Sequence, residues 1–286
     1  MPSPVLDVRV WSTKKETVVR AVWIVLLAAL CGLHAVAAEP ARVMLEELTW
    51  TEVQQAVATG TSTVIVPIGG TEQSGPHMAL GKHNVRVKAL AGKIASRLDG
   101  TLVAPVMAYV PEGAISPPQG HMRFAGTLSV SSESFGGIVE GAARSLRQHG
   151  FRDIVLIGDH GGYQPQLKAI AARLNREWAA SPTRVHFIEA YYSVAQTAYV
   201  DALRAKGLSD FQIGTHAGTA DTSLLMAVDP SLVHPERFEE ASKGGPALGT
   251  VGDPRKASAA LGDMGLELIV TRTVDAIKAA RARPVK

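Results

Sequence analysis

The sequence predicts an α/β fold organised around a mainly parallel β-sheet, and two observations support this. Short apolar runs typical of buried strands alternate along the chain with longer segments of helical periodicity. Such alternation is typical of parallel strands joined by helical crossovers. Hydrophobic residues make up 46% of the 286 residues and charged residues only 19%, which is enough apolar material for one sizeable core.

The first 38 residues predict a secretory signal peptide. The apolar run 21–33 follows several basic residues and precedes the small residues 35–38, the order of regions in such a leader. As a helix this run spans roughly 20 Å, short of the ~30 Å hydrocarbon layer. We expect cleavage near Ala38 and export to the periplasm, with an uncleaved membrane anchor as the alternative. Residues 1–12 lengthen the leader unusually, so the true start could also lie downstream.

The single cysteine, Cys31, lies within this leader. The predicted mature part, residues 39–286, therefore has no thiol, and any metal must be held by nitrogen and oxygen ligands. The leader carries most of the formal net charge of +3, and no basic run indicates nucleic acid. We expect a single domain with no nucleic-acid partner and no stable membrane insertion after cleavage.

The elements of this domain follow in order. Thr49 and Glu52 have the spacing of a capping box, which predicts a short opening helix that stops at Gly60. Residues 63–68 predict a strand buried on both faces, with Pro67 near its end. Further strands are expected at 102–106, 154–157 and 185–188, and helices at 85–98, 135–148, 166–178 and 256–282; residues 242–253, rich in Gly and Pro, are the loosest part.

Three glycine-containing segments carry the titratable side chains that suit chemistry. Two of them directly follow predicted strands, where open α/β sheets bind ligands. Each residue alone has an ordinary structural reading, such as a hydrogen-bonded His or an N-cap Asp, but their clustering favours a site. The segments are 70–84 (GTEQSGPHMALGKHN, with Glu72, Ser74, His77 and His83), 155–163 (VLIGDHGGY, with Asp159 and His160) and 214–223 (GTHAGTADTS, with His216 and Asp221).

These segments together resemble the creatininase (creatinine amidohydrolase) family, in the same order and spacing along most of the predicted mature chain. That family shows TEQHGPH followed by a glycine and Asp, then NGHGG, then HAG with a Glu five positions after its His. Between these motifs, HMRFAGT at 121–127 is similar to the family's H..FPGT stretch. The resemblance implies a three-layer α/β/α fold, a homo-oligomer that is a hexamer in the family, and a divalent metal site that activates water to attack a C–N bond.

The resemblance also implies roles for individual residues. Glu72 and His160 match metal ligands, His83 stands at the position of a metal-bridging Asp, and Asp221 stands at the position of the Glu in the HAG motif. Ser74 replaces a His ligand of a second metal, and Gly162 replaces a metal-binding Glu. These departures predict one metal rather than two, because a neutral imidazole offers a single lone pair to a single metal.

We therefore expect one catalytic divalent ion held by Glu72, His83 and His160, zinc in first place with manganese or iron also compatible. His216 is the candidate proton shuttle, with a near-neutral pKa suited to that role. Asp221 is either a further metal ligand or a residue that orients His216. Supporting or substrate-binding roles are expected for His77, His121, Ser74 and Asp159.

The expected activity is hydrolysis of an amide or lactam bond in a small molecule, with creatinine itself disfavoured by the altered second-metal positions. The alternative is a non-catalytic exported protein that keeps the fold and binds a metal or a small ligand.

Overall fold

A four-stranded parallel sheet forms the centre of the protein. The strand order is β2–β1–β3–β4, and every neighbouring pair runs parallel. The central pair is in register over its whole length, from Thr63 opposite Asp153 to Ile68 opposite Gly158. The strands are β1 (Thr63–Ile68), β2 (Thr101–Val103), β3 (Asp153–Gly158) and β4 (Arg184–Phe187).

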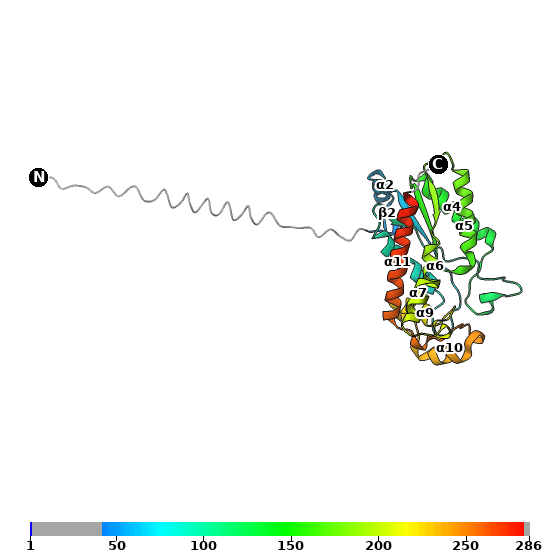
Figure 1. The fold of residues 1–286 in the computed structure, drawn as a ribbon. Helices are drawn as coiled ribbons and strands as arrows, with labels where there is room; N and C mark the ends of the chain where they lie inside the picture. The colour runs from blue at the N-terminus through cyan, green and yellow to red at the C-terminus, as the bar shows by residue number, and fades with distance from the viewer. Residues whose placement is uncertain (2–41, 283–286) are drawn as a thin grey trace. The chain divides into compact units, whose positions relative to one another are not determined.

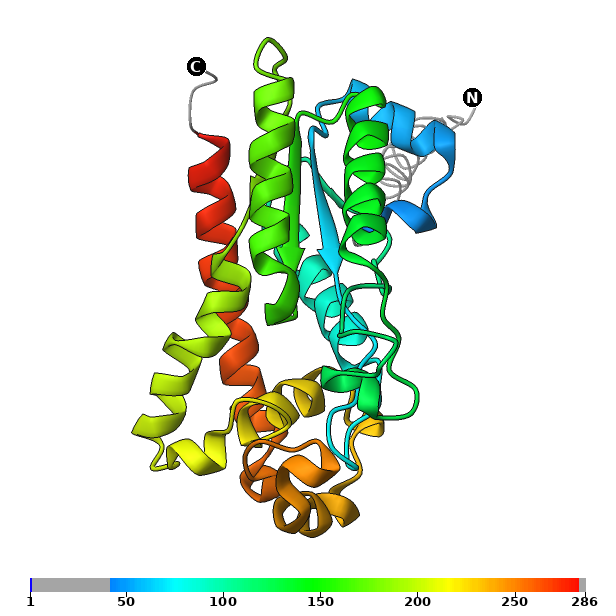
Figure 2. The ribbon, with the colours of Figure 1, turned by 90° about the vertical axis from the view of Figure 1, so that its right-hand side faces the viewer.

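Helices cover both faces of this sheet, which confirms the predicted α/β architecture (Figure 1 and Figure 2). Alternate side chains of β1 serve the two faces, because successive residues of a strand point in opposite directions. Ile65 packs with α3 (Lys82–Ala95) and α11 (Ala259–Arg281). Val64, Val66 and Ile68 pack with the opposite layer, whose main helices are α4 (Ser132–Gln148) and α5 (Gln164–Glu177).

The structure is a computed structural model that describes residues 42–282 together with Met1, and residues 42–282 fall in one compact unit. The predicted leader and its cleavage site lie outside the described residues. Within the described part, no helix combines the length and apolarity needed to cross a membrane. The remaining helices are α2 (Trp50–Ala58), α6 (Ala190–Gln196), α7 (Ala198–Ala205), α8 (Asp210–Ile213), α9 (Thr219–Val228) and α10 (Phe238–Gly244), with short 3-10 turns between them.

Several local predictions are confirmed residue by residue. The capping box of Thr49 and Glu52 opens α2, and β1 spans the predicted residues with Pro67 next to its end. Pro67 has no N–H to donate, yet its carbonyl still accepts a hydrogen bond from the Met107 amide at 3.0 Å. The second strand is shorter than predicted and ends at Val103. The helices α6 to α10 were not predicted, because they are short and carry little independent periodicity.

The strand order creates a crevice at one end of the sheet. From β1 the chain crosses through α3 to β2 on one side, whereas β3 pairs with β1 on the other side. The loops that leave β1 and β3 therefore diverge and open a crevice at the carboxyl ends of these strands. In Figure 2 these ends point toward the part of the molecule that contains α9 and α10.

Candidate active site

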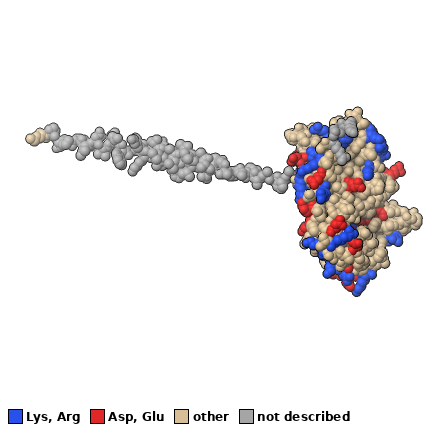
Figure 3. Space-filling view, viewed as in Figure 1, with Lys and Arg blue, Asp and Glu red and all other residues tan. Residues whose placement is uncertain are grey.

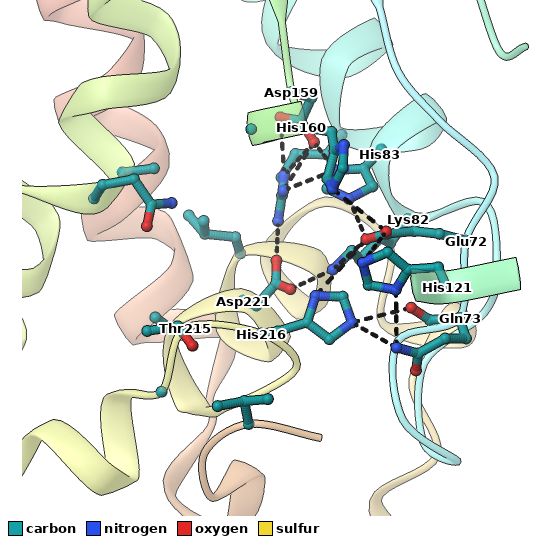
Figure 4. Close-up of a pocket in the computed structure, with 18 of the residues that line it drawn as sticks. Glu72, Gln73, Lys82, His83, His121, Asp159, His160, Thr215, His216 and Asp221 are labelled. Carbon is teal, nitrogen blue, oxygen red and sulfur yellow. Dashed lines mark hydrogen bonds and ion pairs between the residues drawn. The ribbon is translucent and has the colours of Figure 1, made fainter. Parts of the chain in front are cut away.

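A cavity of about 460 Å³ opens at the carboxyl ends of β1 and β3, in the crevice that the topology predicts. Its inner wall carries carboxylates and imidazoles from all three of the segments singled out in the sequence (Figure 4). Lys82 and Arg86 add two basic side chains. Residues from α6 and from the loop after α10 complete the outer wall. The structure thus brings together segments that are up to about 150 residues apart in the chain.

Tyr163 holds the two central loops against each other. Its buried hydroxyl accepts hydrogen bonds from the amides of Asp159 (3.1 Å) and His160 (3.0 Å). The same hydroxyl lies 2.9 Å from the Ile68 carbonyl and 2.6 Å from the Gly69 carbonyl, to which it donates. A single side chain therefore ties the end of β3 to the end of β1 and sets the distance between their functional residues.

Glu72 is the centre of the site, and its two carboxylate oxygens face different surroundings. The side chain is fully buried. Its Oε1 accepts a hydrogen bond from His83 Nε2 at 2.8 Å and lies 3.5 Å from Lys82 Nζ. Its Oε2 faces His121 Nε2 at 3.0 Å and His160 Nε2 at 3.5 Å, without hydrogen-bond geometry to either. Burial alone raises the pKa of Glu72, but the His83 hydrogen bond and the Lys82 charge outweigh burial and hold the pKa well below its usual value.

On the Oε2 side, Glu72, Glu112, His121 and His160 each present a ligand atom within 4.8 Å of the others. Both carboxylate oxygens of Glu112 are buried and have no hydrogen-bond partner within the described residues. Burial, reinforced by the nearby charge of Glu72, raises the pKa of Glu112 to about 9. Two buried carboxylates and two imidazoles around one point form a donor set that suits a divalent cation.

Glu112 reaches this position through loop contacts rather than through a strand or helix. Its amide donates to Ser129 Oγ at 3.0 Å. A Cβ atom at Gly70 would lie 2.5 Å from Glu112 Oε1, so the absence of a side chain at Gly70 lets the carboxylate approach. Glu112 was not among the residues predicted from the sequence. The available signal was an acidic residue between Pro111 and Gly113, in a loop that follows a strand.

The imidazoles of this group are neutral. Burial lowers the pKa of His160 to about 4 despite the opposing charge of Glu72. Burial likewise lowers the pKa of His121, whose Nδ1 lies 3.0 Å from the side-chain amide of Gln73. Neutral imidazole is the form that binds a metal ion. His121, expected only in a supporting role, is therefore placed among the potential ligands.

His83 lies between two carboxylates. Its Nε2 faces Glu72 at 2.8 Å and its Nδ1 faces Asp159 at 2.7 Å. Arg86 Nη2 also lies 3.3 Å from His83 Nδ1, so both ring nitrogens already have close polar partners. The structure thus places His83 next to the metal group and not in it.

Asp221 and Asp159 belong to a buried ion-pair network. Asp221 pairs with Lys82 and, at 2.6 Å, with Arg86 Nη1, while its backbone lies at the start of α9. Asp159 accepts hydrogen bonds from Arg86 Nε at 2.9 Å and from the Tyr191 hydroxyl at 2.9 Å. Although burial opposes ionisation, the charges of Lys82 and Arg86 hold the pKa of Asp221 well below its usual value. Asp221 also lies outside the potential metal group.

His216 faces the cavity from the loop before α9. Its Nε2 donates to the main-chain carbonyl of Gln73 at 3.0 Å, so Nδ1 is the acceptor in the neutral ring and lies 3.8 Å from Glu72 Oε1. A near-neutral pKa was expected for His216 from the sequence, and this expectation was wrong. In the structure, burial and then the charge of Lys82 lower the pKa of His216 to about 3, so the ring is a weak base.

His77 and Ser74 do not line the cavity. The Nε2 atom of His77 lies 3.0 Å from the Thr222 hydroxyl, and its ring packs edge-on against Phe238. Burial lowers the pKa of His77 to about 4. Ser74 is fully buried, and its hydroxyl lacks a hydrogen-bond partner among the described residues. Both residues support the loop between β1 and α3.

Comparison with known proteins identifies a family and several relatives. The family model described as "Creatininase: Creatinine amidohydrolase" matches residues 46–277. The creatinine amidohydrolase of Pseudomonas putida is 29% identical over 255 residues, which cover 82% of this chain and 96% of that protein. The mycofactocin precursor peptide peptidase of Mycobacterium ulcerans is 27% identical over 224 residues, which cover 70% of this chain and 78% of that protein.

Solved structures show the same fold. A structure described as "Creatininase Mn" has a TM-score of 0.68 and 28% identity, and the match covers 85% of this chain and 100% of that one. A mutant creatininase described as "Zn-Zn type" matches with the same TM-score, identity and coverage.

Proposed function

The chain belongs to the creatininase family, a family of metal-dependent amidohydrolases, and we propose that it hydrolyses a C–N bond of a small amide or lactam with one divalent ion held by Glu72, Glu112, His121 and His160. The observation that carries this proposal is the burial of Glu72 beside Glu112. Three of their four oxygens lack a hydrogen-bond partner in the described structure. Buried polar atoms are normally paired, and a cation would satisfy these.

This ligand set differs from the one expected from the sequence. Glu72 and His160 are common to both. His83 and Asp221 engage other charged groups in the structure, whereas Glu112 and His121 each present a ligand atom to the group around Glu72 Oε2. Two carboxylates and two neutral imidazoles suit zinc, which is our first assignment, and manganese is the second. One related structure is described with manganese and another with zinc, so both ions are worth testing.

A divalent ion bound here supplies Lewis-acid polarisation of a carbonyl and lowers the pKa of water. The protein's own residues prepare the surroundings. Lys82 and Arg86 bring positive charge to the inner wall of the cavity, opposite the metal group. The network of Asp159 and Asp221 fixes these two basic side chains, so that their charge is already oriented when substrate enters.

His216 acts on the proton of the attacking water. Its Nδ1 faces the cavity as a hydrogen-bond acceptor, because Gln73 fixes the opposite side of the ring. With a pKa of about 3, the ring holds a proton only briefly. Transfer to the leaving nitrogen is then strongly favourable, and the two proton transfers are expected to be coupled.

The cavity suits a small substrate. Its volume of about 460 Å³ lies within the range of small-molecule sites. Tyr192, Gln196 and Phe124 line its outer part and offer one amide and two aromatic surfaces. An amide or lactam can place its carbonyl toward the metal group and its substituents toward these residues.

A substrate screen tests the proposal. The protein, loaded with zinc or with manganese, is assayed against cyclic and linear amides, with short peptide amides as a second arm. We expect turnover that chelation abolishes and metal restores, and the variant His160→Ala should lose both metal and turnover. Metal bound in full with no turnover across the panel would favour the alternative, a non-catalytic binding protein.

We also propose that the protein forms a homo-oligomer, a hexamer as the resemblance to the creatininase family implies. Several large apolar side chains are exposed on the described part of a single chain, among them Trp50 at 76%, Phe211 at 65% and Ile115 at 60%. Exposed apolar groups of this kind are common at subunit interfaces. Light scattering coupled to size-exclusion chromatography tests this, and a monomer across micromolar concentrations would contradict it.

Export to the periplasm is proposed from the leader sequence alone. The test is N-terminal sequencing of the protein recovered from the periplasmic fraction. A new N-terminus near residue 39 is expected, whereas an intact N-terminus in the membrane fraction would favour the anchored form.

A further inference from the structure

Lys82 occupies the side of Glu72 that faces away from the metal group. Its Nζ lies 3.5 Å from Glu72 Oε1 and forms an ion pair with Asp221. The side chain is only 1% exposed, yet it lines the cavity. A lysine is almost never this deeply buried unless its charge is paired. Here the ammonium lies between two carboxylates at the wall of the cavity (Figure 4).

The carboxylates on this side of the cluster already have cationic partners. Glu72 Oε1 faces Lys82 and His83. Asp159 faces His83 and Arg86. Asp221 faces Lys82 and Arg86. These contacts form a closed network in which Lys82, Arg86 and the His83 ring each bridge two carboxylates.

Glu112 is outside this network. Its one ion-pair contact within the described residues is with His160 Nδ1 at 3.5 Å, and that imidazole is neutral. Among the described residues, Glu112 is therefore the one carboxyl group of the cluster without a cationic partner. It lies on the Oε2 side of Glu72, where a bound cation would favour its ionised form.

We propose that Lys82 is a built-in cation that takes the place of a second divalent ion between Glu72 and Asp221, so that the site holds one exchangeable metal ion. This rests on the proposed function, because it assumes that the group on the Oε2 side binds metal. A second ion would need Glu72 Oε1, His83 and Asp221 as ligands. The ammonium already contacts two of these and would repel a divalent ion at such short range.

This arrangement has a chemical consequence for the reaction. A metal ion can be chelated or exchanged, whereas the ammonium of Lys82 is covalently part of the protein. Chelation therefore cannot remove the positive charge on the Oε1 side of Glu72, and this charge is in place at the cavity wall before substrate enters.

The test is the number of metal ions bound by the full protein. Wild type, Lys82→Met and the control Lys93→Gln are loaded with zinc, freed of excess ion and analysed for metal per chain, with calorimetric titration of zinc as a second readout. Lys93 lies on the same helix but is exposed. We expect one ion in wild type and in the control, and two in Lys82→Met, the second bound at least ten times more weakly.

Two ions in wild type, or one ion in a folded Lys82→Met, would overturn the proposal while leaving the proposed function intact. No ion in wild type would instead contradict the proposed function. Lys82→Arg covers the case in which Lys82→Met does not fold, because it keeps the positive charge and is expected to bind one ion. Two ions in Lys82→Arg would also overturn the proposal.

Discussion

The two sides of Glu72 differ sharply although they belong to one carboxylate. On the Oε1 side, His83, Lys82 and the network behind them supply donors and positive charge. On the Oε2 side lie a second carboxyl group and two imidazoles, and no Lys or Arg of residues 42–282 lies within ion-pair distance of them. Among the described residues, the carboxylates on the Oε1 side have Lys or Arg partners, whereas Glu112 on the Oε2 side has none.

This difference shows how one buried acid can serve two purposes. The partners on the Oε1 side keep Glu72 ionised, as the lowered pKa of this residue shows. Burial and, after it, the charge of an ionised Glu72 raise the pKa of Glu112 to about 9, because a buried site and a like charge both disfavour ionisation. The network therefore prepares the metal group on the Oε2 side without being part of it.

The largest expected effect comes from removing the carboxylate of the incomplete side. Glu112→Gln removes a charged ligand while keeping the size of the side chain. Losing a residue that only hydrogen-bonds to a metal ligand lowers metal affinity roughly 10- to 100-fold. Losing the ligand Glu112 itself should lower it by more. Calorimetric titration with zinc measures this. Glu133→Gln, which changes an exposed glutamate on α4, is the matched control.

A variant on the Oε1 side of Glu72 provides the contrast. Asp221→Asn alters the ion-pair network and should leave a metal ion bound, provided that circular dichroism shows the variant to be folded. If Asp221→Asn loses the metal and Glu112→Gln keeps it, the two sides have been assigned the wrong way round.

A second effect separates binding from chemistry. His216 lies outside the metal group, so His216→Ala should keep its metal while kcat falls about 10²- to 10⁴-fold, the usual contribution of acid–base catalysis. The measurement combines metal content with the turnover of whichever substrate the screen identifies. Wild-type turnover in this variant would remove His216 from the mechanism.

A third effect is a pH dependence of the metal-free protein. Glu112 ionises near 4.5 in the unfolded chain and near 9 in the folded protein. Between these values only the folded state holds this proton, so the free energy of unfolding should fall as pH rises, by at most about 1.4 kcal/mol per pH unit. Urea denaturation at several pH values between 7 and 8.5 tests this. The range lies above the usual pKa of histidine, so histidines contribute little to the slope.

The matched comparison for this effect is Glu112→Gln, which has no proton to lose and should show a shallower slope. Saturating zinc should flatten the wild-type slope as well, because the ion takes the place of the proton. Equal slopes for the metal-free wild type and the variant would mean that Glu112 is not the group responsible.

The smallest effect concerns the contact that holds both loops in place. Tyr163→Phe removes the hydroxyl that links the ends of β1 and β3, and the loss of a buried hydrogen-bonding group costs about 1–3 kcal/mol. Tyr109→Phe, at an exposed position, is the control. Unchanged stability in urea denaturation would show that the hydroxyl contributes little to this junction.

The sequence located the site better than it assigned roles within it. β1 and β3 were recognisable as short apolar runs, and the glycine-containing loops after them placed Glu72, Asp159 and His160 at one edge of the sheet. His216 was assigned to the same site because its segment, residues 214–223, resembles a motif of the family. These inferences depend on local patterns and on the geometry of parallel sheets, which sequence reveals well.

The remaining assignments depended on tertiary contacts. Glu112 reaches the cavity because of the close approach at Gly70 and a hydrogen bond to Ser129, neither of which leaves a local pattern. A motif position could locate His83 and Asp221 but could not show that Asp159, Lys82 and Arg86 would be their partners. The pKa of His216 likewise depends on burial and on Lys82.

The most direct test of the central claim is the position of the metal in a zinc-loaded crystal, located by anomalous scattering at the zinc edge. The account predicts one peak per chain, within bonding distance of Glu112 and His121 as well as Glu72 and His160. A peak bound by His83 or Asp221, with Glu112 remote from it, would contradict the account.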